Sequence, residues 1–260
     1  MIDLHAHVLP GLDDGPENMT EAVAMCARSA ADGTELMVAT PHMFNGVYDV
    51  TPEQVREGVA ALQAELQRQG VGLRLAPGAD VHVDAGLPEA LRAGRVMTVA
   101  DGGKYMLLEL DHETVMPGIE RLIFKLRLAG VVPILTHPER IEEVQRDPGR
   151  LVPLVEAGVP MQLTAMSLTG GFGPAAQRCA NEMVARRLAH VVASDAHSVG
   201  RRGPGLAEAR RVVEESAGAE AAKAMFVDRP RAVVEGRPLA LPEPTEARRP
   251  AGFWSRWFGG

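Results

Sequence analysis

Short apolar runs alternate along this chain with longer segments whose apolar residues recur at helical spacing. The runs with the length and composition of buried strands are Ile2–Val8, Leu36–Thr40, Leu73–Ala79, Tyr105–Leu110, Val132–Thr136, Met161–Thr164 and His190–Ser194. Helices are predicted over Met19–Ala31, Pro52–Gln69, Gly118–Ala129, Arg150–Ala157, Ala175–Arg187 and Gly205–Ser216. Repeated strand–helix units build a mainly parallel sheet, because parallel neighbours need a crossover connection. The pattern therefore predicts an α/β fold with seven strands.

Composition narrows the functional classes. The chain has 260 residues, 46% of them hydrophobic, enough for one large α/β domain or two small ones. Its formal net charge of −7 argues against broad binding of nucleic acid, which needs a basic face, although a local basic pocket stays open. Cys26 and Cys179 are too few for a disulfide framework, and no apolar run has the length of a membrane-spanning helix. We expect a cytoplasmic protein with no nucleic-acid partner.

Polar residues with metal-binding or acid–base chemistry stand at the ends of the predicted strands. They are His5, His7, His42, Asp80, Glu109, His137, Asp195 and His197. Side chains two residues apart on a strand point to the same side, so the HAH and DAH triplets each present two of them to one place. The carboxyl ends of barrel strands open on one face, where active sites are built. The sequence therefore predicts one site that collects all of these side chains.

This convergence favours a metal centre. A histidine pair alone is as compatible with a structural role as with metal binding, and structural, hydrogen-bonded roles are assigned to the more isolated His82, His112 and His190. The full set contains imidazoles and carboxylates but no thiolate, a mixture that suits Mn²⁺, iron or Zn²⁺. The set also contains more ligands than one metal ion needs. We expect a cluster of two or three metal ions.

The order of these motifs resembles that of the PHP (polymerase and histidinol phosphatase) superfamily. Within it, the opening IDLHAHVLPGLDDGP, GAD at 78–80, LTHPER at 135–140, and SDAH at 194–197 followed by arginines resemble the CpsB/CapC-type bacterial tyrosine-protein phosphatases of capsule and exopolysaccharide operons. The resemblance implies a distorted (β/α)7, TIM-like barrel of the PHP type over residues 1–236. Residues 237–260 are expected to be a Pro/Arg linker with an aromatic and basic tail, FWSRWF at 253–258.

The resemblance also implies a ligand set for a trinuclear manganese centre. It assigns His5, His7, Asp80 and Asp195 to a first ion, Asp80, Glu109 and His137 to a second, and Asp14, His42 and His197 to a third. The acid that bridges the first two ions is usually Glu in this family, and the shorter Asp80 puts the metal spacing or affinity of this chain in question. Asp3 and Asp13 are assigned no metal: by position they are a structural partner and a loop-shaping residue.

The implied chemistry is hydrolysis of a phosphate ester by a metal-activated hydroxide, without a covalent phosphoenzyme. Arg140 and either Arg201 or Arg202, with the family's spacing favouring Arg202, are the predicted phosphate-binding groups, because a guanidinium matches phosphate oxygens in a fork. Asp14 and His197 are unranked candidates for the general acid that protonates the leaving group. A cysteine nucleophile is not expected, since neither cysteine has an arginine at the C-x5-R spacing.

The resemblance implies a phosphotyrosine protein as substrate, a membrane-attached bacterial tyrosine autokinase that controls polysaccharide synthesis and export. Two alternatives stay open: a phosphoesterase for a small metabolite such as histidinol phosphate, and a metal-binding regulatory domain without turnover. The tail FWSRWF and its flanking arginines favour peripheral contact with a membrane or a partner groove. The SLTGGFG stretch at 167–173 is expected to be a structural entry to the following helix rather than a phosphate- or peptide-binding loop.

Overall fold

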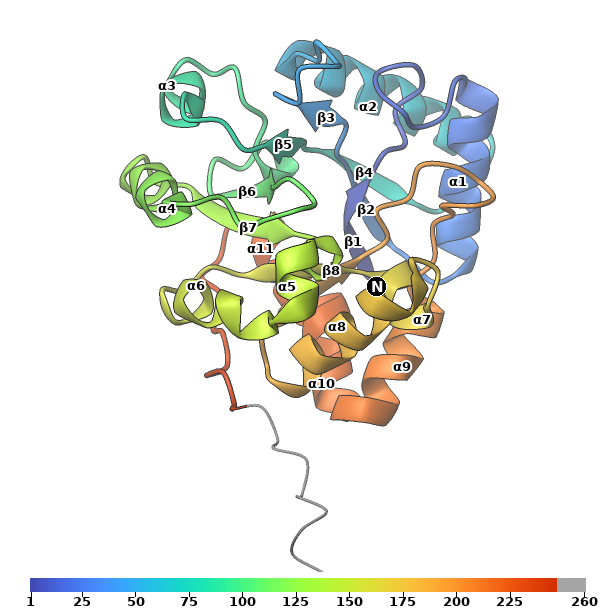
Figure 1. Cartoon of the computed structure of the whole chain (residues 1–260). Coiled ribbons are helices and arrows are strands. Elements are labelled where there is room, and N and C mark those ends of the chain that lie inside the picture. Colours follow the sequence, from blue (N-terminus) through green and yellow to red (C-terminus); the bar gives the residue numbers. More distant parts are fainter. Residues whose placement is uncertain (247–260) are drawn as a thin grey trace, which may run out of the picture.

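The computed structural model describes residues 1–246. Strands form the centre of this part of the chain and helices surround them (Figure 1). The strands are β1 (Ile2–Ala6), β2 (Leu36–Ala39), β3 (His42–Met43), β4 (Arg74–Pro77), β5 (Asp80–His82), β6 (Tyr105–Glu109), β7 (Val132–Thr136), β8 (Met161–Thr164) and β9 (Val191–Ala193). Each predicted strand is present, and the second and third are extended by the short strands β3 and β5. The predicted α/β fold is confirmed.

The strands pair in parallel in two sheets that together form a distorted barrel. One sheet has the order β1-β2-β4, and the other has the order β3-β5-β6-β7-β8-β9. The chain passes from the first sheet to the second after β2 and again after β4. Pro41, between β2 and β3, has no N–H for a ladder hydrogen bond, and a Cβ on Gly78, between β4 and β5, would lie 2.6 Å from Val38 Cγ1. Pro41 therefore interrupts the ladder at the first crossing, and the close approach to Val38 requires glycine at the second.

The barrel closes between its first strand and the segment after its last. Ala6 forms a parallel bridge with Ala196. The N–H of His7 donates to the carbonyl of Ala196 over 2.8 Å, and the N–H of Asp195 donates to the carbonyl of His5, also over 2.8 Å. These bonds make neighbours of HAH and DAH, the two motifs that lie farthest apart in the sequence.

All six predicted helices are present, and several short ones join them. The helices are α1 (Met19–Ala31), α2 (Pro52–Arg68), α3 (Leu87–Arg92), α4 (Ile119–Leu128), α5 (Glu142–Arg146), α6 (Val152–Glu156), α7 (Ala165–Thr169), α8 (Gly173–Ala185), α9 (Ala207–Ala217), α10 (Ala219–Lys223) and α11 (Arg229–Val234). The helix predicted over Arg150–Ala157 is a 3₁₀ turn, Pro148–Leu151, followed by α6. α2 shows the expected start signal: the Thr51 hydroxyl accepts from the N–H of Gln54, whose side chain accepts in return from the N–H of Thr51.

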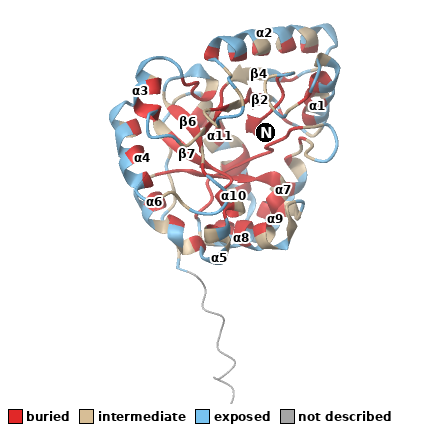
Figure 2. Ribbon diagram, turned by 45° about the horizontal axis from the view of Figure 1, so that its top comes forward, coloured by how far each residue is buried: buried red, intermediate tan, exposed pale blue. Residues whose placement is uncertain are grey.

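Two apolar clusters stabilise the barrel. The larger lies between the strands and the helices, so that Figure 2 shows buried strands at the centre and exposed outer helix faces. The smaller includes Leu107, Ile134 and Val191. Glu109 and Thr136 stand two residues further along the same strands as Leu107 and Ile134 and therefore point to the same side. The smaller cluster thus fills the barrel interior on the side of the strands that carries Glu109.

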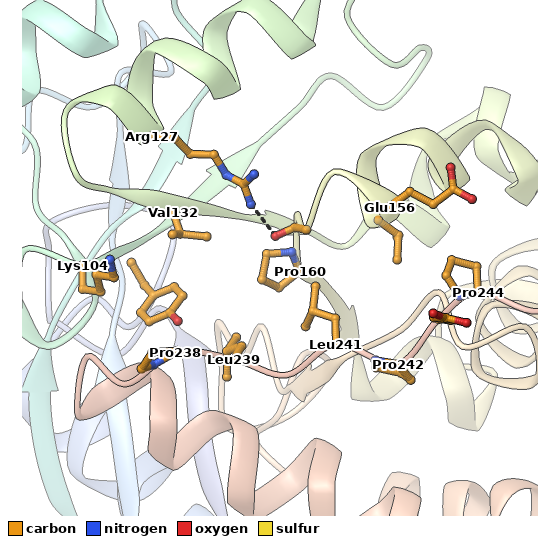
Figure 3. A pocket seen from close by; sticks show the side chains of 14 residues that line it. Lys104, Arg127, Val132, Glu156, Pro160, Pro238, Leu239, Leu241, Pro242 and Pro244 are labelled. Carbon is orange, nitrogen blue, oxygen red and sulfur yellow. Dashed lines mark hydrogen bonds between the residues drawn. The ribbon is translucent and has the colours of Figure 1, made fainter.

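Residues 237–246 pack against the barrel face at which the strands begin. The Tyr105 hydroxyl donates to the carbonyl of Arg237 over 2.8 Å, and the N–H of Thr245 donates over 2.9 Å to the carbonyl of Arg186, directly after α8. A cavity of about 710 Å³ lies between this segment and the barrel (Figure 3). The first part of the expected linker is therefore attached to the barrel, while the tail at 253–258 lies outside the described residues.

His190 is a buried structural histidine directly before β9, as predicted. Its Nδ1 accepts from the N–H of Met161 over 3.0 Å, and its carbonyl accepts from the guanidinium of Arg229 over 3.1 Å. Burial, together with the charge of Arg229, lowers the pKa of His190 to about 3. The folded protein therefore holds this imidazole in its neutral form.

His190 should make the protein less stable in mild acid. Below pH ~6.5 the unfolded chain protonates this imidazole and the folded chain does not, so the free energy of unfolding falls as the pH falls from there toward 3. Between pH 7 and pH 5 this one residue should lower the free energy of unfolding by about 2 kcal/mol. Urea unfolding at both pH values should show a smaller loss for His190→Gln than for the unmodified protein. Equal losses would contradict the prediction.

Candidate metal centre

All of the predicted ligands lie together where the barrel strands end. They are His5, His7, Asp14, His42, Asp80, Glu109, His137, Asp195 and His197. Strands β1, β3, β5 and β6 carry some of them, and the segments that follow β1, β7 and β9 supply the rest. Overlapping subsets have ligand atoms within 4.8 Å of one another. The structure therefore brings together the side chains that the sequence places far apart.

The first group surrounds His5. Its Nε2 lies 3.1 Å from His7 Nε2, 3.4 Å from Asp80 Oδ2 and 3.5 Å from Asp195 Oδ1. All four side chains are buried. Two ligands that bind one ion at about 2.1 Å lie roughly 3.0–3.4 Å apart at tetrahedral or octahedral angles. These separations therefore suit one shared ion.

The second group shares Asp80 with the first. The Thr136 hydroxyl donates to Asp80 Oδ1 over 3.3 Å, which leaves Oδ2 facing His5 and, at 3.9 Å, His137 Nε2. Glu109 Oε1 lies 3.5 Å from the same His137 nitrogen. The shorter acid at this position thus has one oxygen directed toward ligands of both groups.

The third group lies at the exposed side of the cluster. Asp14 Oδ1 lies 3.4 Å from His197 Nε2 and 3.6 Å from His42 Nε2, and the Asp14 side chain is 44% exposed. The other ring nitrogen of His42 lies 3.4 Å from Glu109 Oε2. His42 therefore stands between the second group and the third, and Asp14 marks the opening of the site.

The residues present fit a metal cluster. Asp80 Oδ2 and His197 Nε2 are buried and have no hydrogen-bond partner among the described residues. A buried polar atom left in this way costs about 1–3 kcal/mol, which coordination of a cation would offset. Carboxylate oxygens and imidazole nitrogens are ligands for Mn²⁺, iron and Zn²⁺.

The electrostatics of the site favour cations. Burial opposes protonation of His42, but the carboxylates of Glu109, Asp80 and Asp14 outweigh it and raise the pKa of His42 to about 9. His137 is also buried, and Asp80 and Glu109 likewise raise its pKa to about 9. The carboxylates thus attract positive charge into a largely buried site.

Two of the predicted ligands have a backbone conformation that is uncommon outside glycine. His137 has φ of 34° and Asp195 has φ of 52°, both in the left-handed region. Each such residue costs about 1–3 kcal/mol and persists where the surrounding structure imposes it. Both stand at strand ends, where the chain must turn and still direct a side chain to the cluster.

Neighbouring side chains orient two of the imidazoles. His7 Nδ1 is bonded to Asp13 Oδ2 over 2.6 Å, and His5 Nδ1 is bonded to Gln162 Oε1 over 2.8 Å. In both rings Nε2 is left to face the cluster. Asp13 also accepts from the N–H of Gly15 over 3.0 Å, the loop-shaping role predicted for it. Its contact with His7 was not predicted, and neither was the role of Gln162.

Other residues of the predicted structural set lie nearby. Asp3 is buried and accepts from the N–H of Ser194 over 3.0 Å, so it ties β1 to the segment that carries Asp195. His82 was assigned no role in the site, yet its Nδ1 lies 3.6 Å from Glu109 Oε2 at the edge of the cluster.

The cysteines are unsuited to nucleophilic chemistry. Both Cys26 and Cys179 are buried, and burial raises the pKa of each thiol to about 12. The thiolate, which is the reactive form, is therefore strongly disfavoured. This agrees with the absence of the C-x5-R spacing.

Two arginines meet at the edge of the cluster. Arg140 Nη1 and Arg202 Nη2 each donate to Asp195 Oδ2 over 2.7 Å. Burial opposes ionisation of Asp195, but nearby histidine and arginine charges hold the pKa of its carboxyl well below the usual range. Arg201 is exposed, so Arg202 is the arginine of its loop that reaches the site.

Comparison with known proteins adds independent evidence. Residues 1–235 match the family model described as capsular polysaccharide synthesis, CpsB/CapC. The tyrosine-protein phosphatase YwqE of Bacillus subtilis is 32% identical over 98% of this chain and 100% of its own length. The tyrosine-protein phosphatase CpsB of Streptococcus pneumoniae is 28% identical over 90% of this chain and 98% of its own.

Comparison with solved structures supports the same family. A chain from the crystal structures of YwqE from Bacillus subtilis and CpsB from Streptococcus pneumoniae, described as unique metal-dependent tyrosine phosphatases, matches with a TM-score of 0.91. It is 31% identical, and the match covers 96% of this chain and 100% of that one. The lactonase Lmo2620 from Listeria monocytogenes, 13% identical with a TM-score of 0.61, covers 90% of this chain and shares the fold. This chain therefore belongs to the CpsB/CapC family of capsular polysaccharide synthesis proteins.

Proposed function

We propose that this protein is a metal-dependent phosphatase that hydrolyses phosphotyrosine on proteins and acts in capsule or exopolysaccharide synthesis. The relatives named above are tyrosine-protein phosphatases, and the similarity extends over nearly the whole chain. The observation that carries the proposal is the imidazole and carboxylate cluster with two arginines at its edge. Such a cluster combines cation binding with phosphate binding, which is what hydrolysis of a phosphate ester requires.

The ligand set proposed for this chain holds two or three ions. His5, His7, Asp80 and Asp195 would bind the first, Asp80, Glu109 and His137 the second, and Asp14, His42 and His197 the third. The close approach of these side chains supports the proposal, although His7 also lies close to the third set and His42 close to Asp80 and Glu109. We infer Mn²⁺, with iron and Zn²⁺ as the alternatives that the same nitrogen and oxygen ligands accept. When bound, the ions supply Lewis acidity and lower the pKa of a bound water.

The chain's own residues bind the phosphate and assist the leaving group. Arg140 and Arg202 bind phosphoryl oxygens, since each guanidinium keeps N–H groups beyond those it donates to Asp195. Asp14 and His197, whose side chains lie 3.4 Å apart at the exposed side, are the two candidates for protonating the phenolate oxygen that leaves.

The substrate that we propose is a membrane-attached bacterial tyrosine kinase that regulates polysaccharide export. The family's place in capsular polysaccharide synthesis supports this choice. Among residues 1–246, the helices are all too short or too polar to cross a bilayer. Peripheral membrane contact through the tail at 253–258, whose aromatic and basic residues suit an interface, would bring the enzyme to such a substrate.

Substrate preference tests the proposal. The metal-loaded protein should hydrolyse a phosphotyrosyl peptide with a higher kcat/KM than either the matching phosphoseryl peptide or histidinol phosphate, and a chelator should abolish the activity. A preference for the metabolite by orders of magnitude would show that the substrate is not a protein. If protein with a full metal complement hydrolyses no aryl phosphate, the regulatory, non-catalytic alternative is correct.

The double variant His5→Ala/His7→Ala should lose metal and activity together. It removes two imidazoles from the first group, so elemental analysis should show at least one ion fewer per chain. Hydrolysis of an aryl phosphate should fall to the level of the chelated protein. Circular dichroism provides the check on folding, and retained turnover by a folded double variant would place the site elsewhere.

Asp13→Asn should weaken metal binding or activity by about 10–100-fold, because an amide orients and polarises His7 less well than a carboxylate does. The matched control is Asp84→Asn. Asp84 accepts from the N–H of Gly86 over 2.7 Å in the same kind of turn, but it is exposed on the surface. Metal titration and aryl-phosphate kinetics on both variants check the prediction, which fails if they behave alike.

A further inference from the structure

Phe172 is the residue of the SLTGGFG stretch that reaches the candidate site. It is half-buried in the turn between α7 and α8. Gly170 and Gly173 flank this turn with φ of 90° and 88°, a left-handed conformation that glycine adopts at little cost. The glycines of the stretch thus shape a tight turn with Phe172 inside it.

The ring of Phe172 lies against both arginines of the site. The guanidinium carbon of Arg140 is 4.6 Å from the ring centroid, and that of Arg202 is 5.8 Å from it. Both distances are within the range of cation–π attraction. The same two guanidinium groups donate to Asp195. A carboxylate and an aromatic ring together therefore fix where these cations lie.

Arg140 has other partners within reach. A pocket of about 270 Å³ borders both Arg140 and Phe172, and His112 is another of its lining residues. His112 Nε2 already lies 3.3 Å from Arg140 Nη2 on this side. A guanidinium that turned further into this pocket would lose its hydrogen bond to Asp195. The ring of Phe172 opposes that movement by attracting the cation.

We propose that Phe172 is a positioning residue that holds Arg140 and Arg202 where they bind a phosphoryl group. This inference rests on the proposed function for the role of the arginines, and it gives the SLTGGFG stretch a part in phosphate binding beyond its role as a helix entry. Phe172 acts through the arginines. Its effect should therefore appear in the binding of inorganic phosphate itself, without any turnover.

Calorimetric titration of the metal-loaded protein with inorganic phosphate tests the proposal. Phe172→Leu should weaken phosphate binding by about three- to tenfold, since it removes the aromatic face, and Phe172→Tyr should stay within about twofold of the unmodified protein. The matched control is Phe124→Leu on α4, where the side chain is 62% exposed and should not affect phosphate. For an aryl phosphate, Phe172→Leu should raise KM more than it lowers kcat.

A double-mutant cycle separates positioning from a general structural effect. In an Arg140→Ala background Phe172→Leu should weaken phosphate binding by a smaller factor than in the unmodified protein, because the closer cation is gone. If Phe172→Leu lowers the melting temperature, Phe172→Met replaces it, because its unbranched, flexible side chain of similar volume fills an irregular gap more easily and also lacks the aromatic face. Unchanged phosphate affinity in the folded variant, or an equal factor in both backgrounds, overturns the proposal.

Phosphate titration and hydrolysis assays together test this proposal separately from the proposed function. Phosphate binding that depends on Phe172, with no hydrolysis of aryl phosphates, would refute the phosphatase assignment and uphold the positioning role. Hydrolysis of phosphotyrosyl peptide that is indifferent to Phe172→Leu would refute the positioning role alone.

Discussion

The site depends on the parallel closure of the barrel between β1 and the segment after β9. Because every strand runs in the same direction, the carboxyl ends meet at one face, and closure turns that row of ends into a ring. Backbone hydrogen bonds between His7 and Ala196 and between Asp195 and His5 complete the ring. Without them the histidines from the start of the chain would lie on an open sheet edge, away from Asp195. One pair of backbone contacts therefore sets the geometry of the first ligand group.

Concentrating so many ionisable groups in a largely buried site opposes folding. The surrounding structure offsets this cost with hydrogen bonds, opposite charges and apolar packing. Asp13 and Gln162 fix imidazole rings, Arg140 and Arg202 neutralise Asp195, and the apolar cluster inside the barrel supports the strands from within. The left-handed backbone at strand ends is a further cost that the fold tolerates at this site. Bound cations would remove much of the remaining repulsion among the carboxylates, so metal loading should be coupled to stability.

The sequence predicts the strands, the long helices and the convergence of the ligands, because apolar runs, caps and strand-end polar residues are local signals. Helices as short as α5 and α7, with five residues each, contain too little periodicity to be recognised. The orienting role of Gln162 has no local signal, since Gln162 meets its partner His5 across 157 positions of sequence. The sequence predicts only a helix entry at Phe172, because its partners Arg140 and Arg202 come from other segments of the chain. Only the fold brings them together.

Residues 237–246 lie along the face where the strands begin, so they leave the opposite face, with the opening of the site, free for large substrates. Arg237 and Thr245 lie on the side opposite the opening marked by Asp14, and β1 also starts on that side. Attachment of this face of the barrel to a surface would therefore leave the opening turned outward. A protein substrate could then approach along the barrel axis without meeting the attachment.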